Sequence, residues 1–438
     1  MSMTKPRPAT DPQAVLKPCG CPHVPAVSRR NFLKATGLAS IVAGIAGEDM
    51  FTRMAFGAIP YTGDVLVVLS LRGGFDGLSA IVPAAAADYD DYAALRPNIA
   101  IPSGQLIQLS PQFGMHPAMA PLKPFWDAQT FGVVQAVGMA QPNRSHFDAM
   151  EEMERAAPGS SLRTGWIDRV LGLRDPGTAF QATQMGSNTA ASAFLGPSPE
   201  LAMYDIASFN LNGAWDPTEL SRWDTALRAL NGDAPAAVSA PSITALDAIA
   251  TATALPGSSY VPAHGAVYPA TGLGEAFSNI AQLIKNPTGL QVAAVDYGDW
   301  DMHVDLGAVD AGWMFDKLTE LSGTLSAFAT DLGSTAMNKV TVVTLTEFGR
   351  RAEENGSGGV DHGYGQAVFL MGGGIKGGQV HGAWPGLAPA DLIDGDLNGV
   401  NDYRLVLAEL LEKRCEATSV SGIFPGIDAT RFNIAIQA

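Results

Sequence analysis

Side chains that can bind a metal ion lie in two short segments of the chain. The segment DYGDWDMH supplies Asp299, Asp301 and His303, and GSGGVDHGYG supplies Asp361 and His362. Carboxylate oxygens and imidazole nitrogens are suitable ligands for zinc or manganese. The glycines of the second segment would let backbone and ligands approach an ion closely. The alternative for this second segment is a polar turn that faces water.

Other reactive side chains occur in three more segments. RGGFDG carries Arg72 and Asp76, NRSHFDAM carries Ser145, and EFGRR carries Glu347 and Arg350. Ser145, followed three residues later by an acid, has the form of a helix N-cap. Free amides and the positive end of the helix dipole favour an anion there, as a nucleophile that attacks a phosphate or sulfate ester requires.

The role of several of these residues has an alternative interpretation. Asp76 lies among glycines and could simply close a turn. Asp299 and Asp301 are alternative partners for His303 at a metal. We expect His146, which follows the capping serine, to face elsewhere.

A sheet must position these residues, and the chain contains apolar runs suited to one. Apolar residues recur between the runs at spacings of three and four, as amphipathic helices require. This alternation predicts an α/β fold with a mostly parallel sheet whose strands are buried on both faces. Ligands bind beyond the carboxyl ends of such strands, so we expect the polar segments to meet there. The runs cover residues 64–71, 131–138, 290–297, 339–346 and 367–373.

The N-terminus predicts export. SRRNFLKATG at residues 28–37 is followed by an apolar run over 38–47, a pattern typical of a twin-arginine signal that carries folded proteins across the membrane. A spanning helix needs about 20 apolar residues, so we expect no permanent membrane anchor. We expect residues 1–58 to be the signal segment. Residues 59–438 would form a single periplasmic or extracellular domain, with a helix or peripheral insertion near 233–257.

The charge and the apolar content of the chain limit the kinds of molecule that it can bind. The net charge is −16, and no basic patch interrupts the acidic balance. A polyanion would be repelled by such a chain, so we expect no nucleic-acid partner. Apolar residues make up 47% of the chain and charged residues 16%, which favours one large core.

Six segments, taken in order, carry a family resemblance. They are LRGGFDGLS, NRSHFDAME, GDWDMH, TEFGRRAEENGSGGVDHGYG, FLMGGGIKGG and DYRLVLAELL. Together they resemble the twin-arginine-exported family catalogued as domain of unknown function 1501. That family is similar to the alkaline phosphatase and sulfatase superfamily. The resemblance implies one doubly wound α/β domain with helices on both faces of the sheet, and two metals with a nucleophile between them.

The resemblance also implies roles for individual residues at the second metal. Asp301, or Asp299 by the superfamily's D-x-x-x-H spacing, would pair with His303. His362 would complete this metal site. Asp361 would either ligate the metal or orient His362.

At the first metal the resemblance is incomplete. Asp76 would bind this metal, and Ser145 would be the nucleophile. The phosphatases carry adjacent Asp and His residues after the fourth main strand, whereas Glu347 has no histidine beside it. Glu347 can replace one ligand, and Arg350 or Arg351 can instead supply positive charge to an anionic group.

These residues together predict a hydrolase of phosphate or sulfate esters. It would use one or two divalent ions, zinc or manganese, and Arg72 or Arg350 would bind the anionic group of a small ester. Its other partner would be the twin-arginine export machinery. The alternative is a non-catalytic exported protein that binds a glycan or protein partner, with Trp300 and Trp313 stacking on sugars. A redox enzyme is disfavoured, because no strand is followed by G-x-G-x-x-G.

Overall fold

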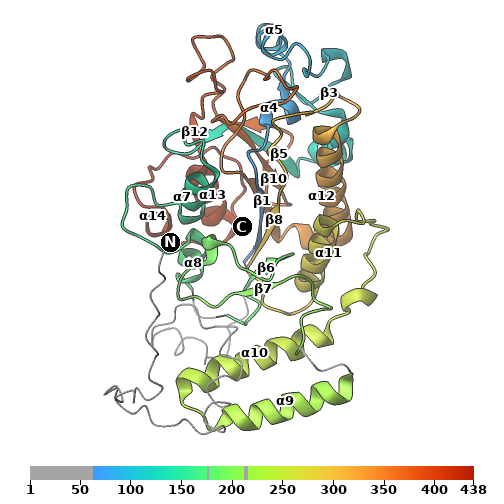
Figure 1. Ribbon diagram of the computed structural model, residues 1–438, viewed down its shortest axis with the longest axis vertical. Coiled ribbons are helices and arrows are strands. Elements are labelled where there is room, and N and C mark those ends of the chain that lie inside the picture. The colour runs from blue at the N-terminus through green and yellow to red at the C-terminus, as the bar shows by residue number, and fades with distance from the viewer. Residues whose placement is uncertain (1–62, 175–176, 212–215) are drawn as a thin grey trace, which may run out of the picture.

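The computed structural model describes residues 63–174, 177–211 and 216–438 (Figure 1). The predicted signal segment, residues 1–58, lies outside the described residues. The described chain is built around one nine-stranded sheet. All five predicted apolar runs form strands of this sheet: β1 (Val65–Leu71), β5 (Phe131–Gly138), β8 (Val292–Tyr297), β9 (Val340–Leu345) and β10 (Gln366–Met371).

Most neighbouring strands of the sheet are parallel. The order is β11-β5-β10-β9-β1-β8-β6-β7, and β12 also pairs with β5. Only β10 runs antiparallel, to both β5 and β9, so the fold is mixed α/β with a mostly parallel sheet. The short strands β6 (Ala182–Met185), β7 (Leu201–Met203), β11 (Val380–His381) and β12 (Asn401–Asp402) extend it. A small antiparallel sheet contains β2 (Ile81–Pro83), β4 (Phe113–Met115) and β3 (Ile107–Gln108).

Successive residues of β1 belong to two different hydrophobic clusters. Leu66 and Val68 pack with side chains of α7, α8 and α13, whereas Val67 and Leu69 pack with side chains of α11 and α12. Both faces of the strand are therefore buried, which explains its continuous apolar sequence. The two helix groups lie on opposite sides of the strands in Figure 1. These helices are α7 (His146–Arg155), α8 (Trp166–Leu171), α11 (Gly272–Lys285), α12 (Trp313–Met337) and α13 (Tyr403–Arg414).

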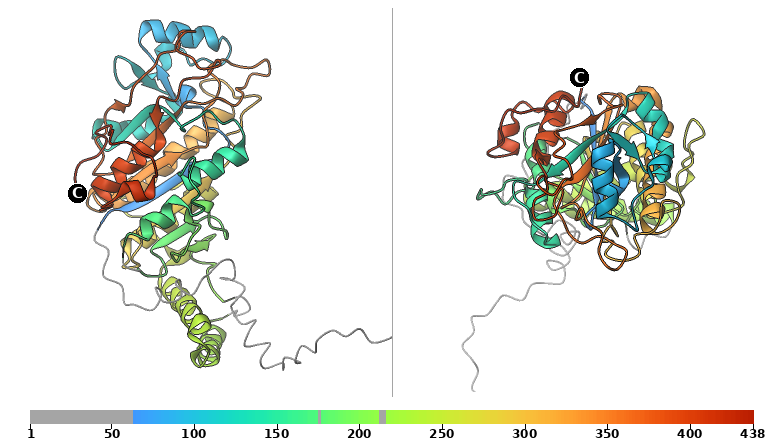
Figure 2. Two further views of the ribbon diagram at one scale, coloured as in Figure 1. Left: turned by 90° about the vertical axis from the view of Figure 1, so that its left-hand side faces the viewer. Right: turned by 90° about the horizontal axis from the view of Figure 1, so that it is seen from above.

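Two helices form an arm that extends from one end of the molecule (Figures 1 and 2). They are α9 (Pro217–Gly232) and α10 (Ala236–Ala254), which pack against each other. The helix predicted near residues 233–257 corresponds to α10, and α9 precedes it. By length and composition, the stretch Val238–Ser259 is apolar enough to cross a bilayer. The remaining helices are short: α4 (Gly77–Ala80), α5 (Ala86–Leu95), α6 (Lys123–Asp127) and α14 (Val420–Ile423).

Candidate functional site

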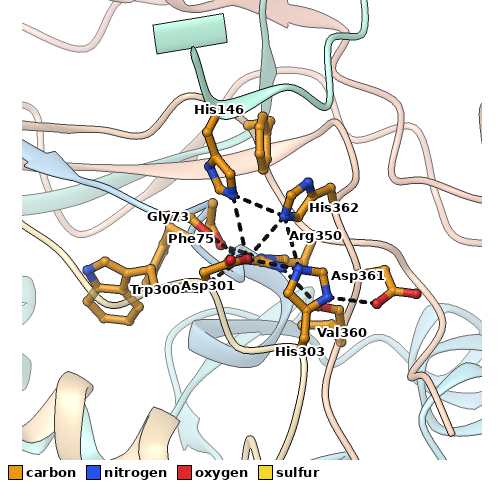
Figure 3. A network of polar contacts seen from close by, with 12 residues as sticks. Gly73, Phe75, His146, Trp300, Asp301, His303, Arg350, Val360, Asp361 and His362 are labelled. Carbon is orange, nitrogen blue, oxygen red and sulfur yellow. Dashed lines mark hydrogen bonds and ion pairs between the residues drawn. The ribbon is translucent and has the colours of Figure 1, made fainter. Parts of the chain in front are cut away.

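Three histidines and one aspartate converge at the carboxyl ends of the central strands (Figure 3). Asp301 and His303 lie in the loop after β8, and His362 lies in the loop between β9 and β10. His146 is the first residue of α7, the helix that follows β5. Because β5, β8 and β9 are parallel, their carboxyl ends meet at one edge of the sheet, where ligands bind in folds of this kind.

The facing atoms of this cluster are the Nε2 atoms of the histidines and Oδ1 of the aspartate. Nε2 of His362 lies 3.1 Å from that of His146, 3.0 Å from that of His303 and 3.0 Å from Oδ1 of Asp301. Oδ1 of Asp301 is also 3.0 Å from Nε2 of His303 and 3.6 Å from that of His146. All four side chains are partly exposed, so solvent or a substrate reaches them.

The other ring nitrogen of each histidine identifies the tautomer. Nδ1 of His146 contacts a Glu347 carboxylate oxygen at 2.8 Å, and Nδ1 of His303 contacts an Asp361 carboxylate oxygen at 2.8 Å. Nδ1 of His362 lies 2.9 Å from the backbone carbonyl oxygen of residue 144. Carboxylate and carbonyl oxygens accept hydrogen bonds, so each Nδ1 donates, and the tautomer that binds a metal through Nε2 is the one these contacts favour.

The lone pairs of His146 and His303 each face that of His362 and the Asp301 carboxylate, and these atoms repel unless a cation lies between them. Ligands bonded to zinc at about 2.0–2.1 Å in a tetrahedron are about 3.3 Å apart, close to the separations among His146, Asp301 and His362. Metal-bound histidines also usually donate their second ring nitrogen to a carboxylate or carbonyl oxygen, as these three do. The donor set therefore fits one divalent ion held by His146, Asp301 and His362, and His303 lies beside Asp301 and His362.

Arg350 holds the aspartate of the cluster. Its Nη2 lies 2.5 Å from Oδ1 of Asp301, and burial of Asp301, which raises its pKa, is outweighed by this guanidinium, so the pKa falls to about 2. Arg350 also donates to the carbonyl oxygens of Gly74, Val360 and Trp300 at 2.7, 3.0 and 3.0 Å. The side chain is fully buried. The prediction that Arg350 binds a substrate anion is therefore wrong, because its donors are occupied by the protein.

Glu347 orients one histidine of the cluster through hydrogen bonds. One carboxylate oxygen accepts from the Gly73 amide at 2.8 Å and from Nδ1 of His146 at 2.8 Å. The other accepts from the Thr346 hydroxyl at 3.0 Å. Glu347 is buried, and its carboxylate orients a ligand rather than facing the shared centre. His146 thus supplies the histidine that the sequence lacks beside Glu347, and the expectation that His146 faces elsewhere is wrong.

Asp361 orients His303 rather than His362. Its Oδ1 also accepts from the Asn355 side-chain amide at 3.0 Å, and these two hydrogen bonds lower the pKa of Asp361. Asp361→Ala is expected to raise the dissociation constant for zinc about 10- to 100-fold, the usual effect of losing such a partner. Metal titration checks this.

Two further variants serve as comparisons for the Asp361 prediction. Asp361→Asn keeps an accepting oxygen and should lose less affinity. Asp310→Ala removes another exposed carboxylate and serves as the control. Equal zinc affinity in wild type and Asp361→Ala would show that His303 needs no orienting partner.

The structure does not bring three other predicted residues into the cluster. Asp76 is buried and accepts from Arg96 at 2.7 and 3.0 Å, so this ion pair occupies the carboxylate that was expected to bind a first metal. Arg72 contacts Glu154 and Asp296, each at 2.7 Å. Ser145 caps α7, as predicted, and its hydroxyl accepts from the amide of residue 148 at 3.4 Å.

The aromatic residues expected to stack on sugars are placed differently. Trp300 is 1% exposed and packs edge-on against Phe75 and Tyr297, with ring centroids 4.8 and 5.6 Å away. A sugar cannot reach this ring, so the expected stacking role of Trp300 is wrong. Trp313 is 38% exposed at the start of α12.

Comparison with known proteins gives a family match within the chain. Residues 219–396 match the family described as "Protein of unknown function (DUF1501)", which confirms the sequence resemblance over those residues. No curated protein matches. Among solved structures, the chain is similar to the lipoteichoic acid synthase LtaP from Listeria monocytogenes, with 9% identity, a TM-score of 0.29, and 75% of this chain and 71% of that chain covered. The family match contains Asp301, His303 and His362, and His146 precedes it.

Proposed function

We propose that this chain, whose residues 219–396 match the DUF1501 family, is an exported metal-dependent hydrolase of phosphate or sulfate esters. The observation that carries the proposal is the partly exposed group of His146, Asp301 and His362, which can hold one ion and has His303 beside it. The proposal includes a doubly wound, alkaline-phosphatase-like arrangement, supported by the two helix groups packed against β1. Export is supported by the twin-arginine pattern of residues 28–37.

One zinc or manganese ion would be held by His146, Asp301 and His362, and when bound it would polarise the ester and stabilise developing negative charge. A second ion finds less support, because Asp76 is paired with Arg96 in the interior. The residues of the chain fix the first ion's surroundings: Arg350 keeps Asp301 ionised, and Glu347 and Asp361 each hold one histidine.

Ser145 is the proposed nucleophile, because the residues on either side of it contact the cluster. The backbone carbonyl oxygen of Arg144, the residue before it, accepts a hydrogen bond from Nδ1 of His362. The residue after it, His146, belongs to the cluster. Ser145 is therefore flanked on both sides by groups attached to the site. The Ser145 hydroxyl would attack the phosphorus or sulfur atom of the ester, and the alcohol would leave.

The N-terminus of α7 is the better anion-binding element. The first amides of a helix have no partner within the helix, and the dipole of this ten-residue helix adds positive potential there. Arg72 is already balanced by Glu154 and Asp296, and the donors of Arg350 are taken. We therefore assign the equatorial oxygens of the ester to the amides at the start of α7.

Three substitutions of Ser145 test this function. Asn caps helices about as well as Ser, so Ser145→Asn should keep the fold and the ion but lower hydrolysis of phosphate or sulfate monoesters at least about 1000-fold. Ser145→Ala should show the same loss with an added cost of about 1 kcal/mol in stability. Ser145→Thr keeps both the hydroxyl and the cap.

The readouts are product release by zinc- or manganese-loaded protein, together with thermal unfolding. Full activity in Ser145→Asn would remove Ser145 from the mechanism. Absence of hydrolysis in the loaded wild type across both ester classes would contradict the proposed function itself.

A further inference from the structure

The arm formed by α9 and α10 exposes large apolar side chains at the end of the molecule opposite to α5 (Figure 1). Trp223 is 52% exposed and Leu230 is 37% exposed. Both belong to α9, whose main neighbour among the described elements is α10. The described part of the chain therefore leaves one side of α9 uncovered.

Four large apolar residues of α9 recur at the spacing of a helix-pairing stripe. Leu220, Trp223, Leu227 and Leu230 are separated by three, four and three residues. This spacing places the four side chains on one side of a helix, as in the seam between two paired helices. Leu220 and Leu227 are half-buried, whereas Trp223 and Leu230 are exposed, so the fold covers only part of the stripe.

The stripe is symmetric about the middle of the helix. Trp223 and Leu227 are centred on residue 225, and so are Leu220 and Leu230, within a helix that covers Pro217–Gly232. A second copy of α9, antiparallel to the first and related to it by a twofold axis near residue 225, would bring Trp223 against Leu227 and Leu220 against Leu230. A twofold interface requires this kind of self-complementary surface. The two helices would overlap along their whole length of about 24 Å.

The charges of the arm disfavour a lipid bilayer as the cover of the stripe. Arg228 links the two helices, with Nη1 2.8 Å from Asp247 of α10 and Nε 2.9 Å from Asp224. Insertion of the arm into a bilayer would carry these charges into hydrocarbon. Residues 217–254 contain four acidic and two basic side chains, so an anionic lipid surface would repel the arm.

A second copy of the chain covers the stripe and leaves these charges in water. Helices of a four-helix bundle pack around a shared apolar core through stripes of this spacing. We propose that two copies of this chain associate through their arms, with the α9 helices antiparallel along the stripe and the two hairpins forming a four-helix bundle. The metal-binding cluster lies outside the arm, so this inference does not depend on the proposed function.

Analytical ultracentrifugation tests the proposal. The exported protein should have about twice the mass of one chain at roughly 100 µM and the mass of one chain near 1 µM, because a small interface typically has about micromolar affinity. The double variant Trp223→Gln, Leu230→Gln should have the mass of one chain at both concentrations. Its thermal unfolding at the lower concentration should match that of the wild type, because both side chains are partly exposed and glutamine favours helix.

The control removes two exposed apolar side chains outside the arm. Val400 is 46% exposed and Ile436 is 51% exposed, and the double variant Val400→Gln, Ile436→Gln should associate as the wild type does. A wild type that keeps the mass of one chain at 100 µM would overturn the proposal. Association of the Trp223, Leu230 variant would place any interface elsewhere and would also overturn it.

A distance between the two copies tests the antiparallel arrangement. Asp233 is exposed at the end of α9, and a spin label on Asp233→Cys reports its separation from the same label in the second copy. Cys415, which is buried, should not take up the label. The antiparallel pair predicts a separation of roughly 25–30 Å, whereas one of about 10 Å would mean parallel helices and contradict the twofold stripe.

Vesicles test the other possible cover. Neutral phosphatidylcholine vesicles should not bind the wild type, because the two copies cover the stripe of each other. Vesicle binding by single chains that is lost in the Trp223, Leu230 variant would make the arm a membrane contact and overturn the proposed pairing.

Discussion

Replacing His303 and His362 together by alanine is expected to remove the bound ion and to abolish ester hydrolysis. His362 is one of the three residues that can hold the ion, and it contacts the other two as well as His303. Loss of a single outer hydrogen-bond partner commonly costs a metal site up to about 100-fold in affinity, and loss of two ligands should cost more. The fold should survive, because both side chains are partly exposed.

Mass spectrometry of the purified protein measures this directly, as equivalents of zinc or manganese per chain. A matched double variant, His264→Asn with His381→Gln, removes two histidines that lie outside the cluster and should keep its ion. Wild-type protein that binds no ion after loading would reduce the cluster to a set of polar surface groups. Equal ion content in both double variants would place the ion elsewhere.

Asp76→Asn is expected to destabilise the protein without releasing its ion. Asp76 and Arg96 form a fully buried ion pair with two hydrogen bonds, so removal of one charge leaves the other without compensation. Breaking a buried pair in this way costs about 3–5 kcal/mol. Denaturant unfolding gives the free energy, and metal analysis of the same samples gives the ion content.

The pH dependence of this contribution has a definite sign. Burial raises the pKa of Asp76, but the adjoining Arg96 guanidinium outweighs it and lowers the pKa below its usual value. Stability from this pair is therefore present above the unfolded pKa of about 3.9 and is lost as the pH falls through the folded value.

A double substitution provides the control for Asp76. Asp76→Leu combined with Arg96→Met replaces both charges by apolar groups, and it should recover much of the lost stability because no buried charge remains unpaired. Loss of the ion from Asp76→Asn with unchanged unfolding would instead make Asp76 a metal ligand, as the family resemblance implies.

The strands were predictable from sequence because they are buried on both faces. Runs such as residues 64–71 and 339–346 are rich in apolar and β-branched residues and carry a charge only at their first position, and the structure makes each of them a strand. The short strands β6 and β7 have no such run, since three or four residues are too few to show a pattern. The composition of β10 also does not indicate that this strand runs antiparallel to its neighbours.

Three of the four cluster residues were predictable in the same way, and the fourth was not. Asp301, His303 and His362 directly follow predicted strands or a glycine-rich segment. His146 was missed because a capping serine accounts for the start of its helix, and sequence spacing does not reveal the contact with Glu347, which is 201 residues away. That glutamate without an adjacent histidine was the signal that could have led to His146. The partner of Asp76 was hidden for the same reason, since Arg96 lies in an unremarked loop after α5.

Arg350 also has a consequence for how the proposed metal site would acquire an ion. One buried guanidinium binds carbonyl oxygens from the loops after β1 and β8 and from its own loop, as well as the Asp301 carboxylate. These bonds hold the three loops together and do not require a metal ion. Small zinc domains gain their folding free energy from the ion and unfold when it is chelated. Here the apoprotein should stay folded, so the ion can be taken up, exchanged or withdrawn as an ordinary reversible ligand.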